Sequence, residues 1–338
     1  MNVLSLFDGI SCGRVALERA GVSVNKYYAA EIDKNAALIA AKNWPENIQL
    51  GDVTKWRDWP IDWDSIDLII GGSPCQGFSF AGKQLAFDDP RSALFFVYVD
   101  ILNHIRSVNP DVKFLLENVK MKKEHLSVIT ETLGVEPVFI NSNLVSAQNR
   151  QRYYWCNWKV TQPEDKGIEL YQILESNPEN VTEMSETFIK RQAGRKCLHT
   201  DLTGKASSLS AMEYVKNGRQ GDYIQFSPAA IVGRKIDEQG KRNDQLGCNA
   251  QQYLEVQGHQ KSRCISTVTK DFVISELPPG RYAMSGNPSF RKLTPIECER
   301  LQTLPDDYTA GVSNTQRYKA IGNGWTVDVI AHIFSKLL

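Results

Sequence analysis

The stretch VLSLFDGISCG, residues 3–13, sets a pattern that the first half of the chain repeats. Its first five residues form an apolar run typical of a buried strand, and a glycine-containing turn follows them. Residues 14–20 then have the pattern of a helix that ends at Gly21. A second strand is expected at 26–30 and a second helix at 34–42, which the Asn-Trp-Pro segment at 43–45 terminates.

The alternation of strands and helices continues up to about residue 133. After a short run at 48–50, strands are expected at 67–71 and 114–116, and helices at 91–108 and 125–133. Strands that alternate with helices of this length predict an α/β fold. We expect a doubly wound, mostly parallel, Rossmann-like sheet with helices on both faces.

The composition changes after about residue 158. Residues 162–290 have few long periodic runs, many Gly, Gln, Asn and Ser residues, and short strand candidates at 223–226 and 264–268. These features predict a smaller, irregular, strand-rich second domain. Helical character returns at Thr294, which forms a capping-box pattern with Glu297, and a last helix is expected at 326–338. We therefore expect a first domain at 1–160, a second at 161–290, and a return to the first at 291–338.

The charge of the chain is balanced overall but unevenly spread. Lysine plus arginine and aspartate plus glutamate both number 39, yet residues 185–292 hold seventeen basic against ten acidic residues, a local charge of +7. A localised basic region is typical of phosphate binding, and a solvated basic face is the alternative for this observation alone. The chain shows no leader pattern and no apolar run long enough for a bilayer, so we expect a cytoplasmic protein without a membrane partner.

The seven cysteines are scattered and form no C-x-x-C pair. An odd number of isolated cysteines predicts free thiols in a reducing compartment and no metal site.

Glycine and acidic residues follow the first three strands, where a doubly wound sheet binds its ligands. Gly9 allows a sharp turn and a close approach of the backbone to a ligand. Glu31 is placed to accept hydrogen bonds from ribose hydroxyls, and Asp52 from an adenine amino group. The layout predicts an adenosine-containing cofactor. The same spacing also occurs in NAD enzymes, but the full G-x-G-x-x-G pattern is missing.

A second group of residues has the chemistry of a reactive site. Cys75, within GSPCQGFS at 72–79, follows the fourth strand, and Glu117 ends the fifth. Gln148, Arg150 and Arg152 alternate along an extended segment, so they are expected to share one face. A small buried hydrophobe is the alternative for Cys75 alone. An acid and two cations at the same edge favour a thiol nucleophile instead.

These stretches resemble the DNA (cytosine-5)-methyltransferases over essentially the whole chain apart from the basic middle segment. Six motifs stand in the order of that family: F-x-G at 7–9, P-C-Q at 74–76, E-N-V at 117–119, Q-x-R-x-R at 148–152, R-x-L-T-P-x-E-x-x-R-L-Q at 291–302 with P-D at 305–306, and Y-K-x-x-G-N at 318–323. The resemblance implies a Rossmann-like methyltransferase domain. It also implies that the basic segment is a target-recognition domain.

The resemblance implies methyl transfer from S-adenosylmethionine to the 5-carbon of a cytosine in a specific sequence of double-stranded DNA, with S-adenosylhomocysteine as product. The thiolate of Cys75 would attack the 6-carbon of a base flipped out of the duplex. Glu117 would hold the ring nitrogen at position 3 and the amino group. Arg152, with Arg150 behind it, would hold the carbonyl edge.

The resemblance also assigns contacts to the cofactor and to DNA. The cofactor contacts would be Phe7, Gly9, Ile10, Glu31, Ile32, Asp52, Val53, Pro74, Leu94, Asn323 and Gly324. The DNA contacts would be Gln76, Ser79, Arg91 and Gln148, together with Ser208, Leu209 and Thr267 in the basic segment. Residues 76–90 would form a lid over the flipped base.

Three positions depart from the usual family pattern. The cofactor loop reads GISCG where many members have G-x-G-G, the last motif has Gly324-Trp325 where Ser-Val is usual, and Ile32 replaces a frequent aromatic residue. The first two are reminiscent of the animal de novo branch, and all three bear on cofactor affinity rather than on reaction type.

Two other functions remain open at this point. One is a catalytically inactive, sequence-specific DNA-binding relative, against which the intact Pro-Cys and Glu-Asn-Val elements argue. The other is an RNA cytosine-5 methyltransferase, which no sequence element excludes. We expect the protein to act as a monomer, and the resemblance allows a cognate restriction endonuclease as a further partner.

Overall fold

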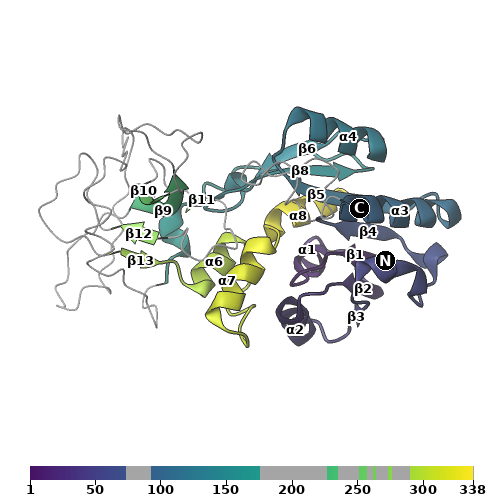
Figure 1. Cartoon of the computed structure of the whole chain (residues 1–338), viewed down its shortest axis with the longest axis horizontal. Coiled ribbons are helices and arrows are strands. Elements are labelled where there is room, and N and C mark those ends of the chain that lie inside the picture. Colours follow the sequence, from purple (N-terminus) through teal and green to yellow (C-terminus); the bar gives the residue numbers. More distant parts are fainter. Residues whose placement is uncertain are drawn as a thin grey trace, which may run out of the picture.

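A computed structural model describes residues 1–73, 93–175, 227–234, 251–256, 262–263, 273–275 and 290–337 (Figure 1). Its main body is a seven-stranded sheet in the order β3-β2-β1-β4-β5-β8-β6. The strands are β1 (Asn2–Leu6), β2 (Lys26–Ala30), β3 (Ile48–Gln49), β4 (Leu68–Gly71), β5 (Lys113–Val119), β6 (Val138–Asn141) and β8 (Gln151–Cys156). The pairs from β3 to β5 are parallel, whereas β8 runs antiparallel to both β5 and β6. The predicted doubly wound, mostly parallel sheet is confirmed.

Helices cover both faces of this sheet, because its central strands are apolar on both sides. On one face, α1 (Cys12–Arg19), α2 (Lys34–Asn43) and α8 (Val327–Phe334) contribute to a core cluster that includes Val3 and Ile70. On the other face, α3 (Ala93–Val108) and α4 (Lys123–Leu133) pack against Leu4 and Ile69. The sheet is thus buried on both sides, and the carboxyl ends of its parallel strands lie at one edge.

Most predicted elements of the first half lie where the sequence places them. Strand β2 has the predicted bounds, and α2 and α4 agree to within two residues. The capping box of α6 (Pro295–Leu301) is present. The Thr294 hydroxyl accepts a hydrogen bond from the Glu297 amide, and the Glu297 carboxylate accepts one from the Thr294 amide. The last helix is shorter than expected and ends at Phe334. Strand β6 and helix α7 (Asn314–Asn323) were not predicted.

The described strands of the middle segment form a separate antiparallel sheet (Figure 1). Its order is β10-β9-β12-β13, with β9 (Ser227–Arg234), β10 (Gln251–Val256), β12 (Val273–Ser275) and β13 (Phe290–Lys292). A further pair joins β7 (Gln148–Asn149) to β11 (Ser262–Arg263). The strand candidates at 223–226 and 264–268 lie outside the described residues. The domain boundaries at 160/161 and 290/291 stay predictions.

The two chain positions that border the middle segment are bonded to each other. The Glu175 amide donates to Glu297 Oε1 at 3.1 Å, and the hydroxyl of Thr294 donates to the Glu175 carboxylate. Arg300 donates to the carbonyls of Ile173 and Leu174. Hydrogen bonds therefore hold residues 173–175 and 294–300 together, so the chain leaves and re-enters the main body at neighbouring points. Among the described helices, none combines the length and the hydropathy that a bilayer crossing requires.

Candidate active site

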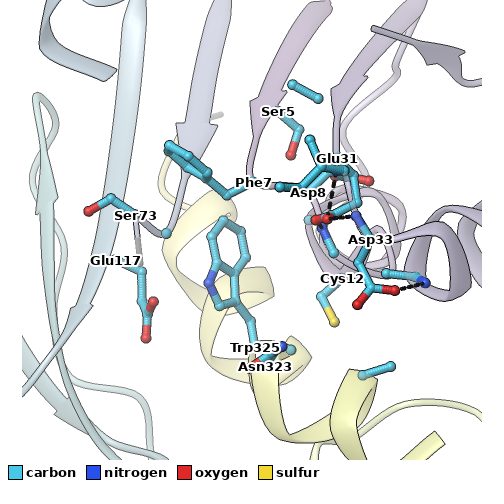
Figure 2. Close-up of a pocket in the computed structure, with 18 of the residues that line it drawn as sticks. Ser5, Phe7, Asp8, Cys12, Glu31, Asp33, Ser73, Glu117, Asn323 and Trp325 are labelled. Carbon is cyan, nitrogen blue, oxygen red and sulfur yellow. Dashed lines mark hydrogen bonds between the residues drawn. The ribbon is translucent and has the colours of Figure 1, made fainter. Parts of the chain in front are cut away.

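A cavity of about 580 Å³ lies at the edge of the sheet where β1, β2, β4 and β5 end (Figure 2). The carboxyl edge of a doubly wound sheet is the expected position for a ligand. The cavity brings together twelve predicted site residues from distant parts of the chain: Phe7, Gly9, Glu31, Ile32, Asp52, Val53, Leu94, Glu117, Arg150, Arg152, Asn323 and Gly324.

The turn after β1 depends on left-handed backbone conformations. Phe7, Gly9 and Ser11 have φ values of 57°, 60° and 59°. A Cβ added at Gly9 would have no protein atom within 4 Å, although the residue lines the cavity. The glycine therefore serves the backbone conformation and leaves the space in front of it to a ligand.

Backbone amides hold Glu31 in place. Its Oε2 accepts from the Gly9 amide at 2.8 Å, and its Oε1 accepts from the amides of Ile32 and Asp33 at 2.8 and 2.6 Å. Ile32, the next residue, is 75% exposed on the cavity wall. A fixed carboxylate beside an uncovered apolar side chain matches the two halves of an adenosine group, a ribose and a flat ring.

Asp52 and Val53 lie at the same end of the cavity. The amide and hydroxyl of Thr54 donate to Asp52 Oδ1 at 2.9 and 2.8 Å. These hydrogen bonds lower the pKa of Asp52 below its ordinary value, so this carboxylate is ionised at neutral pH. Val53, the next residue, is 6% exposed and also lines the cavity.

Glu117 and Arg152 form an ion pair on the other side of the cavity. Arg152 Nε lies 2.8 Å from Glu117 Oε1, and both side chains are mostly buried. In the antiparallel register Val119 pairs with Arg152, so Glu117 stands diagonally across from Arg152 on the same face. Glu117 and Arg152 are thus neighbours because β8 runs antiparallel to β5.

Gly72 makes room for this pair. A Cβ added there would lie 2.9 Å from Glu117 Oε2 and 3.0 Å from Trp325 Nε1. Figure 2 shows the Trp325 indole lying between the Glu117 side of the cavity and the Glu31 side. The tryptophan therefore lies between the two chemical halves of the site.

Two residues of the Q-x-R-x-R motif have structural partners. Arg150 is 4% exposed, and its guanidinium donates to the Gly324 carbonyl at 2.8 Å and to that of Gly322 at 3.4 Å. Gln148 is fully buried and donates to the Leu301 carbonyl and to Gln302 Oε1, both at 3.0 Å.

The structure does not bring Gln148 to the cavity wall with the two arginines, and its contact with DNA stays a prediction. The motif is split between β7 and β8, so alternation along a single strand does not hold. Ile10, the predicted cofactor contact in the turn after β1, does not present its side chain to the cavity either, and its contact stays a prediction. Its side chain is fully buried in the core and is not among the cavity-lining residues, because the turn directs it inward.

Several cavity residues were not predicted: Asp8, Cys12, Asp33, Ser73, Asn118, Lys319 and Trp325. Their positions next to motif residues could have indicated them.

Asp8, one of these residues, accepts hydrogen bonds from Ser11 Oγ at 2.5 Å and from Tyr27 Oη at 2.7 Å. Desolvation raises the pKa of Asp8, and the hydrogen bonds from Ser11, Ser5 and Tyr27 oppose that rise.

Cys12 is not a nucleophile in this setting. Its side chain is 3% exposed, and burial raises the pKa of the Cys12 thiol to about 12. The thiol is therefore protonated at neutral pH, and a protonated thiol is a poor nucleophile.

An ion pair joins α7 to the amino end of α2 at the cavity. Lys319 Nζ donates to Asp33 Oδ2 at 2.6 Å, while Asp33 Oδ1 caps α2 by accepting from the amides of Asn35 and Ala36. The bond from Lys319 is the main cause of the lowered pKa of Asp33.

The remaining predicted site residues lie outside the described residues. They are Pro74, Cys75, Gln76, Ser79, Arg91, Ser208, Leu209 and Thr267, together with the predicted lid at 76–90. Ser73, which lines the cavity, precedes Cys75 in the sequence by two residues.

The fold and the cavity define the class of the protein. The sheet is doubly wound, with one reversed strand next to its edge and a cavity at its carboxyl edge, and this arrangement fits the Rossmann-like domain that the sequence predicts. The whole chain, residues 1–338, matches the model of the C-5 cytosine-specific DNA methylase family, and the chain belongs to that family. It is a DNA (cytosine-5)-methyltransferase, as the sequence motifs indicate.

Individual relatives agree with this assignment. The chain is 27% identical to the type II methyltransferase M.HgiCI of Herpetosiphon aurantiacus, with 100% of this chain and 97% of the relative covered. It is 28% identical to the type II methyltransferase M.HhaI of Haemophilus parahaemolyticus, with 98% and 93% covered. Among solved structures, the methyltransferase EhMeth of Entamoeba histolytica is similar with a TM-score of 0.61 and 18% identity, covering 100% of this chain and 97% of that one. The structural likeness supports the fold. Family membership implies S-adenosylmethionine as methyl donor and DNA as substrate.

Proposed function

We propose that Cys75 is the nucleophile of this methyltransferase and that Glu117 and Arg152 hold a cytosine flipped out of double-stranded DNA. The ion pair at 2.8 Å carries this proposal, because it puts an acid and a cation into the wall of one cavity. Both groups are mostly buried, so their electrostatic effect on a bound base is stronger than it would be in water.

The described residues fit the cofactor in the part of the cavity around Glu31. The carboxylate fixed by three amides suits ribose hydroxyls, exposed Ile32 suits the face of an adenine ring, and ionised Asp52 suits its amino group. Gly9 leaves open space where backbone and ligand would meet. When bound, S-adenosylmethionine supplies an electrophilic methyl group. Phe7, Val53, Leu94, Asn323 and Gly324 would complete this pocket, with Pro74 as a further contact.

The residues on the opposite side of the cavity would activate the base. The Cys75 thiolate would add to the 6-carbon, which pushes an electron pair toward the 5-carbon. Once the 5-carbon carries the methyl group, its proton is lost and the bond between sulfur and the 6-carbon breaks, which restores the ring and frees the thiolate. Glu117 holds a proton at ring nitrogen 3 and so neutralises the charge that develops in the ring. Arg152, already paired with Glu117, is placed to hold the carbonyl edge. Arg150 supports the turn that carries Asn323 and Gly324.

We further propose that residues 161–290 select the target sequence, since the segment at 185–292, which makes up most of them, holds seventeen basic against ten acidic residues and so suits a phosphate backbone. Gln76, Ser79, Arg91, Ser208, Leu209 and Thr267 are the proposed DNA contacts. A single protein molecule would act alone on duplex DNA, and a cognate restriction endonuclease would be its genetic partner. Family membership disfavours an inactive relative or an RNA-directed enzyme.

The test is transfer of labelled methyl groups from S-adenosylmethionine to duplex DNA and to tRNA, with wild type and Cys75→Ala. We expect label in DNA that is lost in the variant, and covalent trapping on DNA that carries 5-fluorocytosine. Label in RNA alone, or undiminished label in Cys75→Ala, would contradict the proposal. Cys298→Ala serves as a matched control, since burial raises the pKa of that thiol well above its ordinary value.

A further inference from the structure

Three exposed lysines lie directly beyond the catalytic strand. Lys120, Lys122 and Lys123, here called the lysine rim, follow the E-N-V motif at the end of β5. Val119 is the last residue of that strand and lines the cavity. The rim is outside the basic middle segment and has no role in the site as described above.

The middle of the rim is anchored. Met121, between the lysines, is buried in the core cluster that α3 and α4 share. Lys120 Nζ donates to Gln151 Oε1 at 3.2 Å, and Gln151 lies between the two arginines of the cavity wall. The backbone of the rim is therefore fixed next to Arg152 and Glu117, while the ammonium groups of Lys122 and Lys123 reach into solvent.

The position of these charges does not favour the stability of the fold. Lys123 is the first residue of α4, and Lys122 precedes it without a side-chain capping bond. Positive side chains at the amino end of a helix oppose its dipole, and the one acidic residue of this first turn, Glu124, offsets only part of the charge of the two lysines. An anion held at the rim would remove this unfavourable interaction.

We infer that the lysine rim binds the DNA phosphates that flank the flipped cytosine. The inference rests on the proposed function: a base that enters the cavity leaves its own backbone phosphates at the mouth, next to the carboxylate that holds it. The rim is the part of the described chain that continues from that carboxylate's strand. Such contacts orient the duplex and are independent of its sequence.

The experiment measures binding to a fluorescein-labelled duplex of mixed sequence by anisotropy over a range of KCl concentrations. Lys122→Ala/Lys123→Ala is compared with wild type and with Lys26→Ala/Lys113→Ala. The control pair removes the same charge at the opposite edge of the sheet, where β2 and β5 begin. Lys120 is left intact because it bonds next to Arg152.

We expect the slope of log affinity against log salt to become shallower by about 1.8 in the rim variant, since each phosphate contact contributes about 0.9. The control pair should keep the wild-type slope. With S-adenosylmethionine present, the rim variant should show a raised KM for DNA and an unchanged kcat.

An unchanged slope in the rim variant, or an equal change in the control pair, would overturn the inference. Methyl transfer to DNA by wild type, measured in parallel, separates the two proposals. If wild type methylates DNA and the slopes agree, only the rim proposal fails. If wild type transfers no methyl group to DNA, the proposed function fails.

Discussion

Replacing Arg150 with lysine keeps a positive charge but removes the forked set of donors that a guanidinium presents. In the structure that fork reaches two carbonyls of one turn, those of Gly322 and Gly324. The turn continues into Asn323 and Trp325, which line the cavity. We therefore expect Arg150→Lys to loosen the turn and to weaken cofactor binding.

The distances set the size of the effect. The bond to Gly324 at 2.8 Å is charge-assisted, and such bonds contribute about 1.5–3 kcal/mol. The contacts with Gly322 at 3.4 Å are longer than ordinary hydrogen bonds and add little. Gln302 also donates to the Gly324 carbonyl at 3.1 Å, so that oxygen keeps one partner. We expect a loss of about 1–2 kcal/mol in the free energy of unfolding for Arg150→Lys, somewhat less than the full bond.

The assay combines urea unfolding with calorimetric binding of S-adenosylhomocysteine. Each 1.4 kcal/mol that binding must spend to restore the turn raises the Kd about tenfold. Arg19→Lys is the matched control. It makes the same substitution in a partly exposed pair with Asp328, where an ammonium can replace the guanidinium, so we expect a change below about 1 kcal/mol.

One result would refute this reasoning. If Arg150→Lys unfolds at the wild-type urea concentration and binds S-adenosylhomocysteine with wild-type affinity, the guanidinium does not hold the turn. A loss of stability without any loss of affinity would separate Arg150 from the cofactor pocket and leave it a purely structural residue.

Three further predictions concern the walls of the cavity. Gly72→Ala puts a Cβ within 3.0 Å of both Glu117 and Trp325, so kcat/KM should fall roughly tenfold to a hundredfold, and steady-state assays on DNA with normal activity would contradict this. The pKa of Asp8 is raised in the folded state, so its ionisation costs stability as pH rises above about 4, and Asp8→Asn should gain stability relative to wild type over that range. A difference in urea stability that stays constant from about pH 4 to 7 would contradict it. Burial and a thiol pKa of about 12 predict that iodoacetamide leaves Cys12 unmodified in the native protein and alkylates it after denaturation, which peptide mass spectrometry can test.

The sequence determined the class of fold and the chemistry of much of the site. The run at residues 3–13, its repetition up to residue 133, and the position of glycines and acids after each strand are local features, and local patterns report parallel strands with helices between them. The cavity therefore contains Glu31, Asp52 and Glu117 as expected. The alternation at 148–152 added Arg152 as a candidate, and the family motifs added the turn at 323–324, which no local pattern connects to the first half of the chain.

The tertiary structure decided how the segment at 148–156 is used. Residue spacing suggested one strand with three side chains on one face. Instead, the segment contains two strands: β7 pairs with β11, and β8 lies antiparallel between β5 and β6. That division buries Gln148, turns Arg150 toward the carbonyls of Gly322 and Gly324, and brings Arg152 to Glu117. Strand direction and pairing depend on partners far away in the sequence, and spacing within one segment contains no information about them. For the same reason, the inward side chain of Ile10 and the position of Trp325 beside Gly72 became apparent only in the folded chain.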